Sequence, residues 1–581
     1  MLKISEIKIT NFRSIHDENF HLRPLTVLIG KNDVGKSNLL EAIRILLEGT
    51  AGSVDTEDFY DEALPLEISA ILEDVRPYLD LCDERTKPKI EKRIDEFGRL
   101  RIRRQAKGPK QLTDIEVEDP ETRDFSPVAG ISAPLKAMLP EVISIGALAD
   151  VADQAKGTQK DALGQLVNQV LSGIVQKIEP KVQTAYEGAD KILNVPRQGA
   201  DERAPELIEI ETELTKYLQQ TFPRASVRLR VQLASIKEIL DRVHVFVREG
   251  SNEDPYYRRG QGMQRTLYLS LLRAEADRIR TDQQIVRPYI LLFEEPEAFL
   301  HPDGQSKMRE ALTTISAGAQ VIAATHSPVM VRPDSLSSVI RVENCQKDGC
   351  QRPVTRGIGP IQTDNLTANQ RQLMPLFSVQ RSSRFLFARG VILVEGASDE
   401  HIFSAIAARI RGFRPEDYEV SIIESGGKDK FVAFAEILNS MGLEVWIVTD
   451  LDFLWNGAGE ILQPDPAYSQ FVQDLRELVP DPDDVSEAAK RAAKKRKTEA
   501  CDRDPQAQRN ALCEKLMMSN IFVLRHGEIE DYVGLTQNSK GQYLKAASEI
   551  RRGNQEILYR EEFERILDAL AVWAGPPAIQ A

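Results

Sequence analysis

Residues 30 to 37 constrain the fold more strongly than any other part of the chain. They read Gly-Lys-Asn-Asp-Val-Gly-Lys-Ser, which matches the pattern GxxxxGK[ST]. An apolar run at 25–28 precedes them, and apolar residues recur at helical spacing from Leu39 to Leu47 after them. A strand, a glycine-rich turn and a helix therefore follow in succession. This order predicts an α/β domain in which backbone N–H groups and the helix N-terminus bind phosphate oxygens.

Side chains of this loop have predicted roles toward a nucleotide. Lys36 reaches the terminal phosphates, and the hydroxyl of Ser37 is a ligand for Mg²⁺. We also assign nucleotide contacts to Asn32, Gly35 and Asn38. The expected cofactor is therefore ATP with its magnesium ion.

Acidic residues stand where a second strand of the same domain is expected to end. Buried strands are predicted at 289–293 and 321–324, as parallel strands of one sheet. Glu294 is predicted to hold Mg²⁺ or its water shell, and Glu295 to polarise the attacking water as a general base. His326 follows the second strand, where an imidazole can sense the γ-phosphate. These residues predict hydrolysis of ATP in addition to binding.

The order of these motifs resembles that of the ABC ATPases. The segment RRGQGMQR puts Gly260 and Gly262 in the place of the signature loop, although LSGGQ itself is not written. In that family the signature loop of one subunit completes the ATP site of the other, so the resemblance implies a homodimer or a higher even oligomer. The opening ITNFRSI, with Arg13 as a nucleotide contact, also looks like this class.

The periodicity of the chain divides it into parts. Apolar residues alternate on both sides of Asp17 and Glu18, which predicts a hairpin with its turn there. A helical pattern then predominates from 151 to 220, and both a dimerisation arm and a plain internal bundle fit it. We predict an ABC-type ATPase domain at 1–150 and 221–375, a helical dimerisation insertion at 151–220, and a second α/β domain at 385–581.

The second α/β domain carries acids at predicted strand ends. Glu395 ends the strand VILVE, and Ser398 is placed as the N-cap of a helix with Asp399 in its first turn. Asp450 and Asp452 follow the strand EVWIVT, two residues apart and so on the same side, ~6.6 Å along an extended chain.

A later segment, HGEIEDYV, adds Glu528, Glu530 and Asp531 just after an apolar strand. Carboxylates that converge without partners repel each other unless cations neutralise them, so the constellation predicts Mg²⁺ or Mn²⁺. Two such ions ~3.5–4 Å apart activate a water molecule and stabilise the leaving oxygen in phosphodiester hydrolysis.

The glycine after Glu395, the GG of ESGGKDK and the DxD strand resemble the Toprim fold. With the ATPase in front, nearly the whole chain resembles the OLD family of nucleases, which includes the nuclease subunit of Gabija-type antiphage systems. The resemblance implies that the acids bind two metals and cut DNA, and that Lys540 or Lys545 stabilises the developing phosphorane charge. The residues that match the family's metal-binding acids are Glu395, Asp399, Asp450, Asp452 and Glu530.

Composition limits how such a protein can hold DNA. There are 75 Lys and Arg against 89 Asp and Glu, a formal net charge of −14, so contact with a polyanion must be local. The basic run at 490–497 is either a positive arm along the phosphate backbone or a solvated helix. Five cysteines, with Cys345 and Cys350 taken as free thiols rather than zinc ligands, suit a reducing cytosol. Without a signal peptide or membrane span, we expect a cytoplasmic protein.

Other functions remain as alternatives. A topoisomerase would need a tyrosine nucleophile on a separate domain, for which the chain has no room. An ATP-gated regulatory or scaffold protein whose acids only bind metal, and a DNA repair nuclease, both stay open. The sequence leaves open whether ATP activates or inhibits cutting, and whether a helicase-like protein is a partner.

Overall fold

The structure is a computed structural model, and it describes a large part of the chain. The described residues are 1–127, 132–146, 183–194 without 186, 203–229 without 221–222, 231, 246–274 without 261, 265, 268–269 and 272, 287–345 without 332, 354–359, and 382–571 without 413, 464, 483–485, 502, 504–505 and 536–541. They form two compact units. One comprises Met1–Phe12, Leu22–Leu25 and Leu39–Ala324, and the other Arg13–His21, Thr26–Asn38 and Thr325–Ala581.

A six-stranded sheet of mostly antiparallel strands begins the chain. The strands β6 and β7 at one end are short, whereas β5 alternates strictly between buried and half-buried residues, as a strand with one face in a core should. Its order is β2 (Ile15–His21), β1 (Lys3–Phe12), β4 (Leu66–Glu73), β5 (Leu100–Ala106), β6 (Glu116–Glu118) and β7 (Phe125–Ser126).

The predicted turn at Asp17 and Glu18 is wrong, because both residues lie inside β2. The turn comes earlier, at Arg13 and Ser14, where Arg13 adopts a left-handed backbone with φ 50°. Residues 16–19 are polar and none of them is buried, and a sequence pattern does not distinguish such an exposed stretch of strand from a turn.

A second six-stranded sheet contains the strands predicted at 289–293 and 321–324. β11 pairs in parallel with β12 and with β8, and β13 pairs in parallel with β3, which confirms a parallel core. Nearly all residues of these strands are buried, as parallel strands covered on both faces require. The order is β14 (Val354–Ile358), β13 (Val339–Cys345), β3 (Leu25–Ile29), β12 (Gln320–Thr325), β11 (Tyr289–Glu294) and β8 (Glu141–Ile145).

Helices accompany these two sheets. The helix α1 (Lys36–Glu48) follows β3, as the spacing of its leucines predicts. Within the predicted insertion at 151–220 the structure describes residues 183–194 in part and α6 (Pro205–Gln219), while its other residues lie outside the described part. The remaining elements are α2 (Lys87–Glu91), α3 (Ser132–Met138), β9 (Phe246–Glu249), β10 (Asn252–Pro255) and α9 (Pro302–Ile315).

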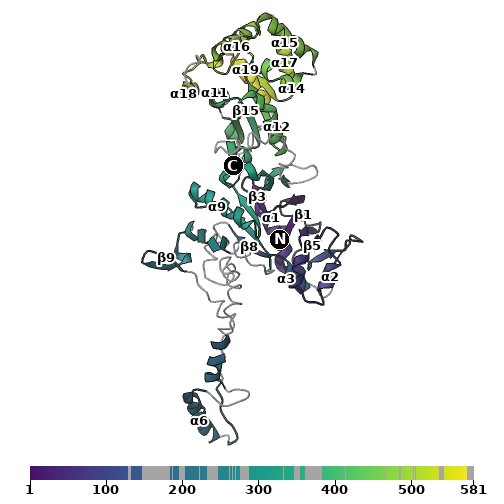
Figure 1. Ribbon diagram of the computed structural model, residues 1–581, viewed down its shortest axis with the longest axis vertical. Coiled ribbons are helices and arrows are strands. Elements are labelled where there is room, and N and C mark those ends of the chain that lie inside the picture. The colour runs from purple at the N-terminus through teal and green to yellow at the C-terminus, as the bar shows by residue number, and fades with distance from the viewer. Residues whose placement is uncertain are drawn as a thin grey trace. The chain divides into compact units, whose positions relative to one another are not determined.

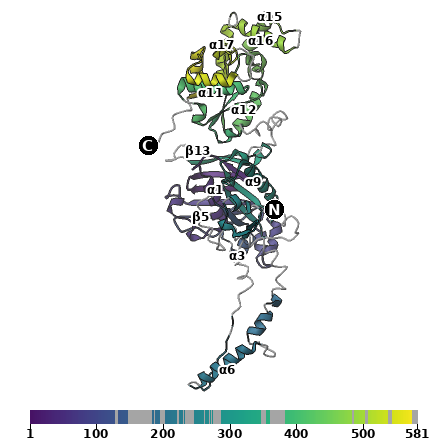
Figure 2. The ribbon, with the colours of Figure 1, turned by 90° about the vertical axis from the view of Figure 1, so that its left-hand side faces the viewer.

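The C-terminal domain is built on a four-stranded parallel sheet, on which α11 and α12 pack (Figures 1 and 2). Its order is β16 (Val420–Glu424), β15 (Gly390–Val394), β17 (Glu444–Thr449) and β18 (Ile521–Val523), with α11 (Ala397–Arg411) and α12 (Phe431–Ser440) as crossovers. The chain leaves β15 toward β16 on one side and returns to β17 on the other. Such a reversal opens a crevice at the carboxyl ends of the two strands, where ligands of α/β proteins bind.

Two groups of helices follow β17. The final pair, α18 (Gln542–Arg552) and α19 (Arg560–Ala571), joins the core of the sheet through Ala547, Ile550 and Phe563. The basic run at 490–497 lies within a helix, α16. The helices between β17 and β18 are α13 (Phe453–Asn456), α14 (Gly459–Leu462), α15 (Pro466–Leu478), α16 (Glu487–Cys501) and α17 (Gln506–Met517). Among the described helices, none has the length and apolar character needed to cross a bilayer.

Candidate metal centre and phosphate-binding loop

Three acidic residues come together at the carboxyl ends of the neighbouring strands β15 and β17. Glu395 follows β15, and Asp450 and Asp452 follow β17, whose strand is the parallel neighbour of β15. Each of the three offers a carboxylate oxygen, and these oxygens all lie within 4.8 Å of one another. The sequence predicted this convergence from acids that stand 55 and more residues apart. Oxygen ligands at such spacing suit a hard divalent cation.

The geometry of the DxD segment differs from the predicted one. Asp452 is not on an extended strand: it has helical backbone angles and is the N-cap of α13. The chain turns after Thr449, and this turn brings the two carboxylates together with Glu395. The prediction of an extended DxD was wrong because the apolar residues Phe453 and Leu454 begin a buried helical turn immediately afterwards.

Buried oxygens of this cluster lack partners among the described residues. Oε2 of Glu395 and Oδ1 of Asp452 are buried and accept no hydrogen bond there, and Asp452 is only 3% exposed. Burying a carboxylate oxygen without a donor costs several kcal/mol, on the order of 2–7. A bound cation would supply the missing interaction, so these residues fit a divalent metal.

Burial and mutual repulsion perturb the acids as expected for such a site. Burial raises the pKa of Glu395, an effect that Lys428 opposes and Asp452 reinforces. Burial also raises the pKa of Asp399 to about 7, with Glu530 and Glu395 adding to the shift. The pKa of Asp450 is well above its usual range, first through burial and then through the charge of Asp399. A divalent ion would favour the ionised forms instead.

Two lysines that sequence reasoning did not assign to the site contact the acids. Lys428, from the ESGGKDK loop, forms an ion pair with Asp452. Lys494 of α16 places its Nζ 2.5 Å from Glu528 Oε1, 3.1 Å from Asp452 Oδ2 and 3.7 Å from Asp450 Oδ2. Burial lowers the pKa of Lys494, but the three acids raise it by more than burial lowers it. The net pKa is raised, so the ammonium stays charged.

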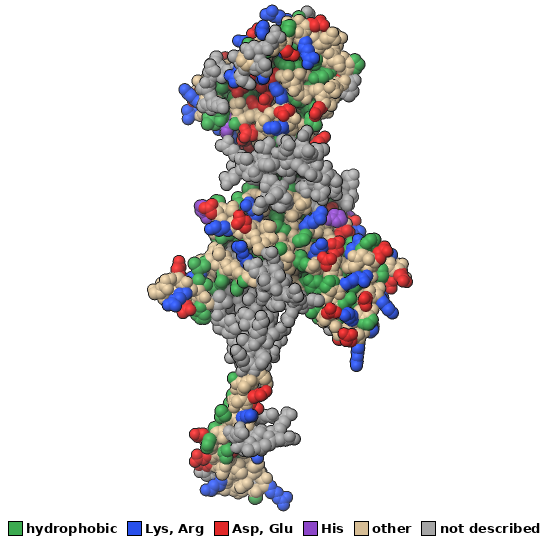
Figure 3. All heavy atoms as spheres, viewed as in Figure 1, with side chains coloured by type: hydrophobic (Ala, Val, Ile, Leu, Met, Phe, Trp, Pro, Cys, Tyr) green, Lys and Arg blue, Asp and Glu red, His purple; other side chains and the backbone are tan. Residues whose placement is uncertain are grey.

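The basic side chains of residues 490–497 therefore point in different directions. Lys494 faces the acids, whereas Lys490, Arg491, Lys495 and Arg496 are exposed. Figure 3 shows acidic and basic side chains interspersed on the surface of this domain. Contact of the exposed residues with a phosphate backbone stays a prediction.

The segment after β18 brings further acids to the same edge. The amide of Ile529 donates to Asp450 Oδ1 at 3.3 Å, and the amide of Leu451 donates to Gly527 O at 3.1 Å. Glu528 contacts Lys494, and Glu530 lies near enough to Asp399 to raise its pKa. Neither Asp399 nor Glu530 belongs to the close triad, so their role as metal ligands stays a prediction.

Asp399 has a local role of its own. The helix α11 begins at Ala397, with Gly396 rather than Ser398 as its N-cap. Asp399 Oδ2 accepts the amide of Gly396 at 2.8 Å, which satisfies a donor at the helix start. The predicted N-cap is thus two residues too late, because a glycine in extended conformation was not recognised as a cap. Lys540 lies outside the described residues, and Lys545 is exposed on α18.

The phosphate-binding loop has the backbone that its glycines predict. Gly35 has φ +99°, and a Cβ there would lie 2.2 Å from Thr355 Oγ1. Lys36 is 6% exposed, and its Nζ donates to Gly30 O at 3.0 Å. The Lys36 ammonium also donates to Lys31 O, so both of these carbonyl groups hold it inside the curl of the loop. Phosphate oxygens bind at this position in loops of this type.

The other predicted nucleotide contacts divide between the two units. Arg13 Nη1 donates to Asn38 Oδ1 at 3.4 Å, and the Asn38 amide donates to Ser14 Oγ at 2.7 Å, so both residues adjoin the loop. Asn32 and Ser37 are exposed on the loop itself. His326 belongs to the same unit, directly after β12.

Glu294, Glu295, Gly260 and Gly262 belong to the other unit. Glu294 ends β11, and Glu295 has a left-handed backbone with φ 46° while its amide donates to Ala324 O at 2.8 Å. A non-glycine residue in that conformation stores strain of about 1–3 kcal/mol, which is a recurrent property of functional sites. Neither Gly260 nor Gly262 has a positive φ, but a Cβ at Gly262 would lie 3.3 Å from the backbone oxygen of Phe299, so close packing favours glycine there.

The fold and the two sites define a class of protein: an ATPase domain with a phosphate-binding loop, followed by a Toprim domain with a carboxylate cluster. Residues 25–332 match the family described as "AAA domain, putative AbiEii toxin, Type IV TA system". Residues 386–452 match the family described as "Overcoming lysogenization defect protein-like, TOPRIM domain". The first match spans more than half of the chain, so the chain belongs to this family of ATPases, and with the second match its two domains resemble those of the OLD nucleases.

Curated relatives span most of the chain. The Old nuclease of Escherichia phage P2 is 29% identical over 78% of this chain and 78% of its own length. Endonuclease GajA of Bacillus cereus (strain VD045) is 24% identical over 78% of this chain and 75% of its own length. The OLD nuclease of Thermus scotoductus is 21% identical over 78% of this chain and 82% of its own length.

Proposed function

We propose that this protein is an ATP-binding, divalent-metal-dependent DNA endonuclease that acts in antiphage defence. The single observation that carries the proposal is the triad of Glu395, Asp450 and Asp452, with buried oxygens that have no partner among the described residues. A site of this kind needs a cation, and it lies where α/β proteins bind ligands. The relatives named as nucleases and endonuclease support DNA as the substrate.

The residues of the C-terminal domain would divide the work. Glu395, Asp450 and Asp452 would hold one Mg²⁺ or Mn²⁺, and Asp399 and Glu530 are the proposed ligands of a second. When bound, such ions lower the pKa of a water molecule and stabilise the leaving oxygen of a phosphodiester. Lys428 and Lys494 keep the acids neutralised before metal binding, and they place positive charge where a phosphate would approach. A catalytic role of Lys540 stays a prediction.

The ATPase domain is proposed to regulate the cutting. Lys36, Ser37, Gly35, Asn32, Asn38 and Arg13 would bind ATP, and Glu294, Glu295 and His326 would support its hydrolysis with Mg²⁺. Gly260 and Gly262 of one subunit would complete the site of a partner copy, which requires a homodimer or a higher even oligomer. A helicase-like partner and a cytoplasmic location stay predictions.

Cleavage of supercoiled plasmid DNA tests the function. The wild-type protein should cut with Mg²⁺ or Mn²⁺ and stop when EDTA is added, and Asp450→Ala should lower the rate at least 100-fold. The matched control is Glu444→Gln, an exposed acid at the opposite end of the same strand β17, which should cut normally. Absence of cutting by the wild-type protein with either ion would favour a regulatory or scaffold protein that only binds metal.

A further inference from the structure

The loop from Arg525 to Tyr532, which we call the acidic loop, carries Glu528 and Glu530 to the carboxylate cluster. Its amide at Ile529 also donates to Asp450 Oδ1. The strand β18 ends at Val523, so strand pairing does not hold this loop. Gly527 has φ +125°, and a Cβ there would lie 2.3 Å from Asp531 Oδ2, so the loop is tightly curled. Something beyond the sheet must fix its two ends.

One carboxylate, that of Glu562 on α19, reaches both ends. Its Oε1 accepts the backbone amide of Arg525 at 2.9 Å, and its Oε2 accepts the hydroxyl of Tyr532 at 2.5 Å. The same hydroxyl accepts the amide of His526 at 3.1 Å. Glu562 is 14% exposed on its side chain, and Tyr532 is fully buried. A single side chain therefore joins the first, second and last residues of the acidic loop.

Charge and stacking reinforce these bonds. Glu562 lies 3.9 Å from Arg525 Nε and 3.9 Å from His526 Nε2. The ring of His526 stacks on Tyr559, just before α19, with centroids 3.8 Å apart and planes 8° apart. Burial and then the charge of Glu562 raise the pKa of Tyr532, so its hydroxyl stays a donor. The start of α19 thus serves as a rigid support for the acidic loop.

We propose that Glu562 is a positioning residue of the metal centre, which holds the acidic loop so that Glu528, Glu530 and the amide of Ile529 face the triad. The positioning role itself does not depend on the proposed nuclease function. Only its effect on DNA cleavage rests on that function. Glu562 itself does not contact the triad, and its action runs through the loop. Groups that orient metal ligands typically contribute about 10-fold to 100-fold to metal affinity.

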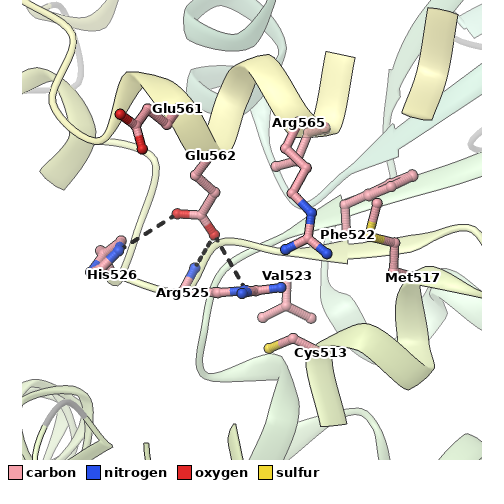
Figure 4. A pocket seen from close by; sticks show the side chains of 10 residues that line it. Cys513, Met517, Phe522, Val523, Arg525, His526, Glu561, Glu562 and Arg565 are labelled. Atoms are coloured by element: carbon pink, nitrogen blue, oxygen red, sulfur yellow. Dashed lines mark hydrogen bonds and ion pairs between the residues drawn. The ribbon is translucent and has the colours of Figure 1, made fainter. Parts of the chain in front are cut away.

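A cavity beside Glu562 makes the proposal testable by chemical rescue. The cavity has a volume of about 320 Å³, and its lining includes Glu562, Arg525, His526 and Arg565 (Figure 4). Glu561 of the same helix also lines it, but no contact of that side chain with the acidic loop is drawn in Figure 4. A small carboxylate such as formate can enter a space of this size and take the place of a deleted side chain.

The experiment compares Glu562→Ala with Glu561→Ala, a neighbouring acid exposed on the same helix. Hydrogen exchange of the peptide covering residues 525–533 should accelerate at least tenfold in Glu562→Ala and stay unchanged in Glu561→Ala. Mn²⁺ affinity, measured by calorimetry, should fall about tenfold, and added formate should restore both quantities. Tyr532→Phe, which keeps the ring but removes the hydroxyl, is the milder variant if Glu562→Ala does not fold.

The outcomes separate the two proposals. Unchanged exchange of residues 525–533 in Glu562→Ala, or in Tyr532→Phe if that variant is used, overturns the positioning role whatever the protein does to DNA. Accelerated exchange without a change in Mn²⁺ affinity also overturns it, because the loop would then not serve the metal. A wild-type protein that binds Mn²⁺ but does not cut DNA overturns the nuclease proposal and leaves the role of Glu562 to be judged by affinity and exchange.

Discussion

Replacement of Lys494 by methionine should lower the stability of the metal-free protein and raise its affinity for the metal. The Nζ of Lys494 lies between three acids, and its side chain is 27% exposed. A charge pair at about 4 Å contributes about 4 kcal/mol in a partly buried site, and removal of one partner of such a pair costs about 3 kcal/mol after desolvation is counted. Methionine keeps the length and the helix propensity of lysine but removes the charge.

The change in stability should be visible on heating. In a domain of 150–250 residues, about 3 kcal/mol corresponds to a fall in Tm of roughly 6–12 °C, which differential scanning calorimetry in EDTA can measure. Saturating Mn²⁺ should restore most of this loss, since the cation takes over the neutralising role. Mn²⁺ should also bind on the order of 30-fold more tightly to Lys494→Met, because the ammonium and the ion compete for the same oxygens and restoring about 2 of the 3 kcal/mol requires a gain of that size.

The matched control is Lys495→Met, the next residue of α16, whose side chain is exposed. It removes the same charge and should change the metal-free Tm by no more than about 1 °C. An unchanged Tm in Lys494→Met, or a fall in its Mn²⁺ affinity, would refute the idea that Lys494 neutralises the acids when no metal is bound.

The remaining predictions concern pH and the phosphate-binding loop. The pKa of Asp399 is raised to about 7, so between about pH 4 and 7 this residue binds a proton in the folded protein that it does not bind in the unfolded chain. The stability of the metal-free protein should therefore fall as pH rises through this window, while Mn²⁺ affinity should increase. Calorimetry at pH 6 and pH 8 measures both quantities. Gly35→Ala should lower ATP affinity at least tenfold in a fluorescent-nucleotide titration, because a Cβ at φ +99° meets Thr355, while Gly52→Ala, with open space around its Cβ, should not. Lys36→Ala should abolish ATP binding without altering Mn²⁺ affinity of the C-terminal domain, and cleavage that responds to neither ATP nor this substitution would contradict regulation by the ATPase.

Sequence reasoning succeeded where one local pattern determines the structure. The continuous apolar runs at 289–293 and 321–324 are buried parallel strands, because only strands covered on both faces need such composition. Glu395, Asp450 and Asp452 converge because acids at the carboxyl ends of neighbouring parallel strands share one edge of the sheet.

It failed where the structure depends on contacts between distant segments. Lys494 looked like one of several basic residues, and its orientation toward the acids follows from how α16 packs, which no periodicity records. Glu562 contacts residues 30 and more positions away, and its helix reads as an ordinary amphipathic one. The turn at Arg13 and Ser14 was missed because a left-handed arginine is not favoured by its side chain.

The most direct test of the metal centre is anomalous diffraction from a crystal of the protein grown with Mn²⁺. We expect an anomalous peak within bonding distance of carboxylate oxygens of Glu395, Asp450 and Asp452, with Lys494 displaced from Asp452. A crystal with Mn²⁺ bound elsewhere, or with these three side chains pointing away from one another, would contradict it.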